Sequence, residues 1–303
     1  MNTHITYHVT HRTTYKYSEP VSISHHVLRL SPRATSRQHV LKSELQIEPT
    51  PIVLSQYTDR YSNSIHFLSI EGGHQELIIN STSAVELFSA PTPALEETTS
   101  WENVCEHCAN HPLGDMLEAA EFTYDSPLIQ TGPDYKDYAA QSFPSDCPVL
   151  AATADLTHRI FKDFKFDPEA TTVATPLQEV FRKRRGVCQD FAHFEIACLR
   201  SLGLPARYIS GYLETDPPPG KPRLIGADAS HAWISVYCPG FGWVDFDPTN
   251  NVIPTTRHIT VAWGRDYSDA CPIRGVILGG GRSQLSVAVD VLRTDTPTEE
   301  TAA

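Results

Sequence analysis

The sequence predicts an α+β protein in which a buried helix packs on an antiparallel sheet, preceded by an all-β domain of sandwich-like type. Three observations lead to this fold class. Residues 1–88 carry short alternating strand patterns separated by turn signals. A strongly apolar helix pattern begins at Cys188 and is stopped by Gly203 and Pro205. A hairpin pattern with one wholly apolar face spans residues 230–247.

Composition restricts the class of protein and its partners. The chain has 303 residues, of which 40% are hydrophobic and 20% charged, so we expect a globular protein of one large or two ordinary domains. The net charge of -12 argues against nucleic acid or an anionic membrane as the main partner. No run approaches the ~20 apolar residues of a membrane span. The first 14 residues also lack the apolar core of a signal peptide. The seven cysteines suggest no disulfide framework, which favours a reduced, cytoplasmic protein.

The first 88 residues read as a sandwich or open barrel of short strands. The first strand alternates between polar residues and an inward-facing set: Tyr7, Val9, His11, Thr13, Tyr15 and Tyr17. Further strands are expected at residues 24–30, 40–48, 64–70 and 75–88, with Gly72-Gly73 among the turns. His25 and His26 resemble a metal pair, but no third ligand is near, so we interpret them as part of a strand edge.

Residues 89–97 are expected to form a linker, and residues 98–120 a helix that starts near Ser100. Cys105 and Cys108 lie inside this helix. A Cys-x-x-Cys pair can supply half of a zinc site, but no second pair follows at a suitable spacing. We therefore interpret the two residues as semi-buried thiols.

Two more helices lead to the most informative stretch. One covers residues 146–164, and a shorter one has Thr175 as its N-cap, Pro176 at its first position and Gln178 completing a capping box. The shorter helix ends in the basic run 182–185 before Gly186, where a solvated face is the default interpretation. A secondary hypothesis is that one of these arginines helps to hold Cys188 as a thiolate.

Cys188 stands at the start of the apolar helix, where unpaired backbone N–H groups and the helix dipole favour a negative charge. The helix is apolar almost all round, as in a domain centre. Cys198, in its middle, is expected to be a packing residue, whereas Gln189, Asp190 and His193 are polar exceptions near the reactive end. Position alone therefore makes Cys188 a candidate nucleophile.

The hairpin places a histidine and an aspartate together. A strand is expected at residues 206–213, then an exposed loop at 214–223 that could form the rim of a cleft. If the hairpin is centred on Pro239, His231 lies opposite Asp247, with Cβ atoms ~5 Å apart. One face of the hairpin then carries His231, Trp233, Ser235, Tyr237, Trp243, Asp245 and Asp247. The other face is uniformly apolar, which supports this parity of register.

Cys188, His231 and Asp247 are residue types that together suit acyl transfer. A thiol needs a base to hold it ionised, and the imidazole of His231 can do this. A carboxylate such as Asp247 can fix the tautomer of the imidazole and stabilise its charged form. Backbone N–H groups at the start of the helix can stabilise an oxyanion. The alternative is a buried thiol, a strand-end histidine and a turn aspartate with no joint role.

At these positions the sequence resembles the transglutaminase-like superfamily of papain-fold cysteine enzymes, in its bacterial branch with an added N-terminal β domain. The matching motifs are Gly186 to His193, Leu202 to Tyr208 with Ser210 to Tyr212, Ser230 to Trp233, and Gly242-Trp243 through Asp247 to Thr249. Segments 15–18 and 28–33 resemble the companion β domain. The resemblance implies that Cys188 is the nucleophile, His231 the base, and Asp247 rather than Asp245 the acidic member. It does not fix the reaction, because members include acyl transferases, peptidases, amidases and inactive binders.

We therefore expect a cysteine-dependent amide or peptide hydrolase with no cofactor and a peptide or protein amide as substrate. Transglutaminase-type transfer to a primary amine, a non-catalytic peptide-binding module, and a metal site made of Cys188, His231 and Asp247 remain as alternatives. No lysine-binding feature or calcium loop is evident, which favours hydrolysis. The expected domains are 1–88 and a catalytic domain at 89–293, which ends in strands at 253–261 and 276–292 with a glycine turn. Residues 294–303 are expected to be a disordered tail.

Overall fold

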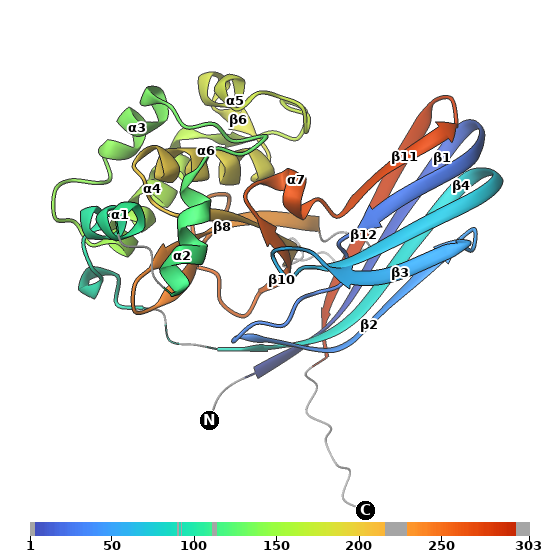
Figure 1. The fold of residues 1–303 in the computed structure, drawn as a ribbon, viewed down its shortest axis with the longest axis horizontal. Helices are drawn as coiled ribbons and strands as arrows, with labels where there is room; N and C mark the ends of the chain where they lie inside the picture. The colour runs from blue at the N-terminus through green and yellow to red at the C-terminus, as the bar shows by residue number, and fades with distance from the viewer. Residues whose placement is uncertain (1–3, 90, 92, 111–113, 216–228, 295–303) are drawn as a thin grey trace, which may run out of the picture.

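The computed structural model describes residues 4–89, 91, 93–110, 114–215 and 229–294. These residues form a helical body built on a small sheet, with a second, larger sheet beside it (Figure 1). The α+β class is confirmed. No helix within the described ranges is both long enough and apolar enough to cross a membrane.

The larger sheet is organised by β1 (His4–Leu28), which runs through its centre. On one side β1 pairs with β4 (Ser64–Phe88). On the other side it pairs with β12 (Ser283–Arg293) and β11 (Ile273–Gly279). Strands β2 (Gln38–Glu48) and β3 (Val53–Thr58) pair with β4. All these pairs are antiparallel, and strands from both ends of the chain therefore share one sheet.

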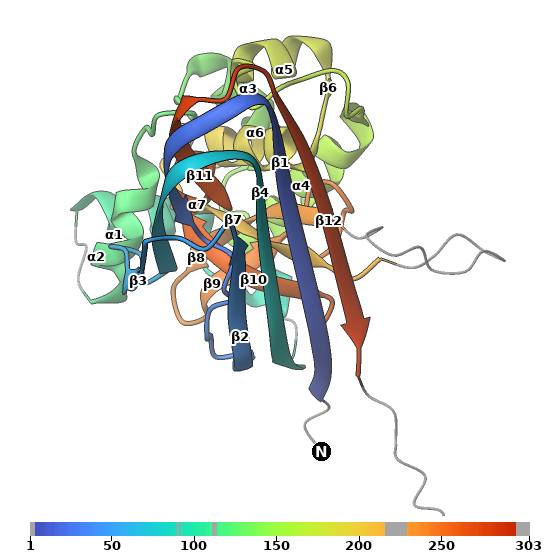
Figure 2. The same ribbon diagram turned by 90° about the vertical axis from the view of Figure 1, so that its right-hand side faces the viewer.

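This sheet folds back on itself. Strand β12 pairs with residues 7–17 of β1, whereas β11 pairs with residues 21–28 of the same strand. Figure 2 shows β1 and β4 bending over at the top of the molecule. The bend encloses a cluster in which Tyr17 and Leu77 from one half pack with Leu28 and Leu68 from the other. One sheet thus makes two layers, which confirms the sandwich-like character of the N-terminal region.

Several local expectations for this sheet are corrected. Gly72-Gly73 is a bend inside β4 and not a turn between two strands. Strand β3 was not predicted, and all six of its residues are exposed, so it has no alternating pattern to detect. His25 and His26 lie on a strand with partners on both sides, so they are not at an edge. The inward set of the first strand is confirmed, because its members are buried apart from the half-buried Tyr15.

The helices cover the smaller sheet. They are α1 (Trp101–Asn110), α2 (Asp115–Ala120), α3 (Pro133–Ala140), α4 (Val149–Asp163), α5 (Leu177–Lys183), α6 (Cys188–Ser201) and α7 (Tyr267–Ala270). Two short 3-10 turns, η1 (Leu95–Glu97) and η2 (Glu121–Thr123), and a two-residue parallel pair, β5 (Lys165–Phe166) and β6 (Arg185–Gly186), connect them.

Two helix predictions are wrong in detail. The helix expected at 98–120 is two helices, α1 and α2, and Gly114 before the second of them has a φ of 57°, a conformation that glycine adopts readily. Helix α5 begins at Leu177 with Pro176 as its N-cap, so Thr175 does not cap it. The Thr175 hydroxyl instead accepts a hydrogen bond from the backbone N–H of Thr172 at 2.9 Å. The Thr175 hydroxyl is therefore used in a local turn with Thr172 and does not cap the helix.

The smaller sheet has the order β10-β7-β8-β9, with β10 (His258–Gly264), β7 (Ala206–Leu213), β8 (Ala229–Cys238) and β9 (Gly242–Phe246). Its strands are antiparallel. Helix α6 packs against β7 and β8 and is buried along most of its length, as expected. Residues 216–223 of the expected rim loop lie outside the described residues.

The hairpin register differs from the expected one by two residues. Tyr237 pairs with Trp243 and Ser235 with Asp245, so the turn is centred on Gly240 and not on Pro239. Gly240 and Gly242 both have positive φ, which a tight turn of this kind uses. A shift of two residues leaves each side chain on its expected face. Asp247 lies just beyond β9 and makes a separate bridge with Val252.

The two sheets are held together by a shared core and by polar contacts. Tyr7, Val9 and Val291 of the larger sheet belong to the same buried cluster as helix α6. The Tyr7 hydroxyl donates to Glu214 Oε2 at 2.9 Å, and His11 Nδ1 lies 3.0 Å from the Tyr212 hydroxyl. The strands expected at 276–292, within the expected catalytic domain, thus pair with β1 of the larger sheet. Of the expected tail, residues 295–303 lie outside the described residues.

Candidate active site

The turn before α6 presents Cys188. Asp190 Oδ2 accepts hydrogen bonds from the Val187 backbone N–H at 2.8 Å and from the Thr171 hydroxyl at 2.6 Å. Gly186 leaves room for this carboxylate, because a Cβ there would lie 2.4 Å from Asp190 Oδ2. Asp190, one of the polar exceptions of the helix, therefore holds its first turn, and Cys188 remains partly exposed.

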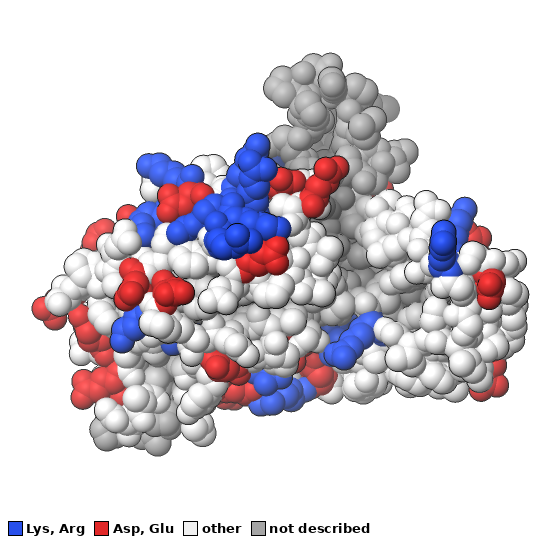
Figure 3. All heavy atoms as spheres, turned by 90° about the horizontal axis from the view of Figure 1, so that it is seen from above, with Lys and Arg blue, Asp and Glu red and all other residues white. Residues whose placement is uncertain are grey.

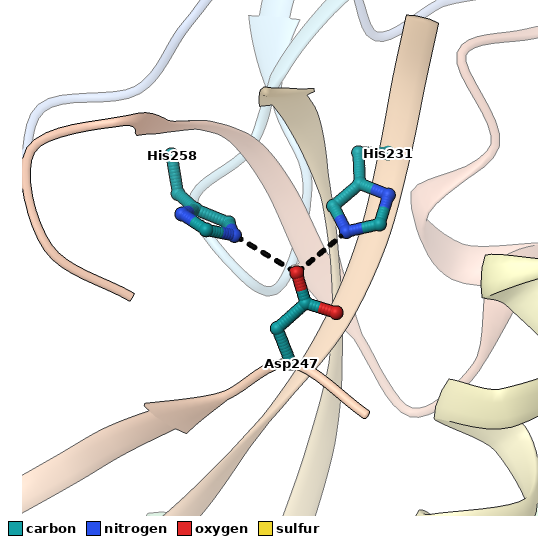
Figure 4. Close-up of side chains that lie close together, drawn as sticks. All are labelled: His231, Asp247 and His258. Atoms are coloured by element: carbon teal, nitrogen blue, oxygen red, sulfur yellow. Dashed lines mark hydrogen bonds and ion pairs between the residues drawn. The ribbon is translucent and has the colours of Figure 1, made fainter. Parts of the chain in front are cut away.

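His231 on β8 and Asp247 after β9 form a buried pair (Figure 4). His231 Nε2 lies 2.8 Å from Asp247 Oδ2, and the carboxylate is completely buried. Burial disfavours the charged form of each group. At His231, the hydrogen bond that its ring donates to Asp247 and its hydrogen bond with Cys188 outweigh burial and raise its pKa to about 10. At Asp247, the hydrogen bonds from His231 and His258 likewise outweigh burial and hold the pKa of the carboxyl well below its usual range.

Asp247 is anchored by its own turn. The backbone N–H groups of Thr249 and Asn250 donate to Oδ1 at 2.9 and 3.2 Å. The Asn250 side-chain amide donates to Oδ2 at 2.7 Å. These neutral donors fix the carboxylate in one orientation, and their hydrogen bonds favour its ionised form.

His258, at the start of β10, is a site residue that sequence reasoning missed. Its Nε2 lies 3.0 Å from the same oxygen of Asp247 that His231 contacts (Figure 4). The side chain is buried, and its Nδ1 has no hydrogen-bond partner among the described residues. The residue lies on a strand that was expected from the sequence. A histidine in an otherwise apolar strand was the available signal. The pairing of that strand with β7, which brings His258 to Asp247, was not predictable from the sequence.

The structure brings Cys188, His231 and Asp247 together. Because Asp247 is ionised and accepts from His231 Nε2, the neutral ring of His231 carries its lone pair on Nδ1. That nitrogen is the one left for the Cys188 thiol, whose hydrogen bond helps to raise the pKa of His231. The geometry thus supports transfer of the thiol proton to the imidazole.

A cation would fit this cluster poorly. The side chains that could hold one are His231, Asp247 and His258, whose ligand atoms lie within 4.8 Å of one another. This set contains His258 in place of Cys188, which the metal hypothesis had named. Both histidines meet the carboxylate at hydrogen-bond distances. A metal ion would have to replace both of these hydrogen bonds.

Other residues of interest in the sequence lie apart from this site. The Arg184 guanidinium stacks on Phe181 and Tyr138, and Arg185 pairs with Asp167. Neither arginine is thus placed to hold the Cys188 thiolate. Figure 3 shows Lys and Arg side chains gathered on this upper face of the helical body. Cys105 and Cys108 are free thiols, and burial raises their pKa values to about 12 and about 11.

A cavity of about 280 Å³ opens beside Cys188 and His231. Tyr267 also lines it, so part of the segment 263–267 that was expected near the cleft reaches the site. The Tyr267 backbone N–H donates to His193 Nε2 at 3.1 Å, which ties this segment to α6. A larger hollow of about 530 Å³ lies beyond Gln189 but does not reach the thiol.

Comparison with known proteins gives matches along most of the chain. Residues 7–86 match the bacterial transglutaminase-like N-terminal region, and residues 137–248 match the transglutaminase-like superfamily. An uncharacterized protein of Mycobacterium tuberculosis is 42% identical over 291 residues, which cover 94% of this chain and 92% of that protein. One of Mycobacterium leprae is 32% identical over 295 residues, covering 94% and 98%.

Two further similarities are more distant. A solved structure of a Cytophaga hutchinsonii protein, described as a proposed cysteine protease, has a TM-score of 0.76 at 21% identity. It covers 98% of this chain and 94% of its own, and it shows that the fold is shared. A protein-glutamine gamma-glutamyltransferase of Pseudomonas aeruginosa is 31% identical over 107 residues, covering 33% of this chain and 16% of the relative. The chain belongs to the transglutaminase-like superfamily, in the group that carries the bacterial transglutaminase-like N-terminal region.

Proposed function

We propose that the protein is a cysteine-dependent amide or peptide hydrolase that works through a thioester on Cys188, with His231 as base and Asp247 as its partner. The observation that carries this proposal is the 2.8 Å contact between His231 Nε2 and a buried, ionised Asp247, beside a thiol at a helix start. This is the arrangement that activates a thiol for attack on a carbonyl carbon.

The steps follow from the positions of the groups. Cys188 gives its proton to His231, and the sulfur attacks the carbonyl carbon of the amide. The backbone N–H groups of Cys188 and Gln189, in the first helical turn, have no intrahelical acceptor and can stabilise the oxyanion. The C–N bond then breaks, and the leaving amine takes the proton from His231. Water attacks the thioester as His231 accepts a proton from it. The thiolate then leaves and regains that proton, and a carboxylic acid is released.

Transfer of the acyl group to a primary amine is the second candidate. It uses the same thioester, and the local similarity to the Pseudomonas aeruginosa gamma-glutamyltransferase favours considering it. Hydrolysis remains our preference, because no lysine-binding feature is evident in the sequence. The cytoplasm is the compartment we propose, since its reducing conditions keep a nucleophilic thiol available.

The experiment is incubation of the protein with an amide substrate and a labelled primary amine. We expect hydrolysis to exceed incorporation of the label, and the reverse ratio would favour the transferase. A non-catalytic binding module is tested separately with iodoacetamide near neutral pH. We expect Cys188 to be alkylated faster than the other six thiols, and equal rates would support the binding module.

A further inference from the structure

The cavity beside Cys188 has walls from both sheets. From the helical body, Cys188, Gln189, His231 and Tyr267 contribute. From the larger sheet, Tyr15 of β1 and Leu285 and Val287 of β12 contribute. The N-terminal sheet therefore forms one side of the space into which the reactive thiol opens.

The wall made by β12 is apolar and available for contact. Leu285 is paired with Tyr15 across the strands, and Val287 with Thr13, so these side chains stand next to one another on one face. Leu285 is 57% exposed and Val287 is 49% exposed. When a substrate covers this exposed apolar area, the area is removed from water, and this removal favours binding.

The cavity is also nearly free of charge. Among the described residues that line it, Lys, Arg, Asp and Glu are absent. His11 lines it too, but burial lowers its pKa to about 4, so its ring is neutral near pH 7. Of the described side chains that line the cavity, His231 is the charged one near pH 7, because its pKa is raised to about 10. An ionised side chain placed here would lose its water without gaining a partner.

The wall is fixed in place. His11 and Tyr7 bond to Tyr212 and Glu214 of the helical body, and Arg293 Nε at the end of β12 pairs with Glu214 at 2.7 Å. Val289 and Val291 of β12 are buried in the core shared with α6. The distance from the apolar face to the thiol is thus set by packing and not by a movable loop.

From these observations we infer that the larger sheet supplies the acyl-group pocket of the enzyme, and that this pocket accepts an uncharged, apolar or aromatic acyl side chain of the size of one residue. The volume of about 280 Å³ lies just below the usual range of small-molecule sites, which suits a single such group. The inference rests on the proposed function, because it places the acyl group of that reaction.

The experiment measures alkylation of Cys188 by four iodoacetamides: the parent compound, N-benzyl iodoacetamide, anionic N-(iodoacetyl)glycine and a cationic aminoethyl analogue. Each rate is divided by the rate with glutathione, which removes the intrinsic reactivity. We expect the benzyl compound to be favoured over the charged ones by about tenfold, which corresponds to about 1.4 kcal/mol, because its phenyl group loses contact with water in the pocket. Equal normalised rates for the benzyl and charged compounds would overturn the inference.

Substitutions in the wall formed by β12 test whether the preference for the benzyl compound arises there. Val287→Asp is expected to remove most of the preference, and Leu285→Gln to weaken it. Val276→Asp is the matched control, because Val276 is 67% exposed on β11 and does not line the cavity. Thermal unfolding checks that each variant is folded. A loss of preference in Val276→Asp equal to that in Val287→Asp would also overturn the inference.

A turnover assay separates the pocket from the proposed function. It uses one peptide amide scaffold with leucine, phenylalanine, glutamate or lysine on the acyl side. Faster turnover of the charged substrates refutes the pocket and leaves the hydrolase standing. A benzyl preference in alkylation without turnover of any amide supports the pocket and refutes the hydrolase.

Discussion

The imidazole rings of His231 and His258 lie 5.9 Å apart, centroid to centroid, and their Nε2 atoms meet the same oxygen of Asp247. One carboxylate oxygen therefore receives two histidine N–H groups as well as the Asn250 amide. Both rings also pack near Trp233, whose ring lies 6.1 Å from that of His231 and 5.1 Å from that of His258.

Replacing the nucleophile tests the basis of the proposal. Cys188→Ala removes the atom that forms the thioester, so amide turnover is expected to fall to background. The melting temperature should change little, because Cys188 is only partly buried. Cys147→Ala is the matched control, since Cys147 is also a partly buried free thiol, and it should keep full activity. Turnover that survives Cys188→Ala would remove the assignment.

Asp247→Asn tests the partner of the base. The amide would place a donor where a carboxylate accepted, which favours the wrong tautomer of His231. We expect kcat to fall by about 10³-fold or more, as in other triads. The alkaline limb of the pH profile should also move to lower pH, because Asp247 helps to raise the pKa of His231 to about 10. Measurement of kcat/KM between pH 6 and pH 10 checks both effects, and an unchanged profile contradicts the role of Asp247.

His258 is expected to act as a positioning residue through Asp247. His258→Phe keeps a ring beside Trp233 but removes the donor to the carboxylate, so kcat should fall by about tenfold, in line with a hydrogen bond to a charged group. KM should change little, since His258 does not line the cavity. His258→Gln restores an N–H donor and should recover part of kcat. A purely structural role would instead lower the melting temperature of both variants while leaving kcat unchanged.

A buried carboxyl group in the core is expected to make the stability of the fold depend on pH. Glu195 on α6 is completely buried, accepts a hydrogen bond from the Thr157 hydroxyl at 2.6 Å, and has its pKa raised to about 8 by burial. The unfolded chain releases this proton near its ordinary pKa of 4.5, whereas the folded protein keeps it. The stability it contributes is therefore complete below pH 4.5 and is lost as the pH rises towards 8.

Glu195→Gln removes this titration while keeping the shape of the side chain. The free energy of unfolding of the variant should fall less between pH 5 and pH 8 than that of the parent protein, by up to about 1.4 kcal/mol per unit of pKa difference. Denaturant titrations at both pH values give the comparison. Parallel pH dependences would show that Glu195 is not protonated in the folded state.

The parts of the structure that could be predicted are those with a strong local pattern. The strand Ala206–Leu213 has its expected bounds, and the helix that begins at Cys188 ends one residue before the expected end. The faces of the hairpin were also right, because side-chain parity survives a register error of two residues.

What could not be predicted depends on contacts between distant segments. The place of β12 on β1 is set by residues more than 250 positions apart, such as Thr13 and Val287, and neither strand's own pattern identifies its partner. The contact of His258 with Asp247 depends in the same way on how β10 is placed beside β7. The pocket wall and the second histidine therefore needed the structure.

The position of β12 in the chain has a consequence for synthesis in the cell. The ribosome makes Cys188, His231 and Asp247 before it makes Leu285 and Val287, which complete the wall of the cavity. The larger sheet is also incomplete until β11 and β12 have been synthesised, because they are the partners of β1 on one of its sides. Under the proposed function, a nascent chain holds the candidate nucleophile before the proposed pocket exists, and selectivity for the acyl group requires that β11 and β12 have paired with β1.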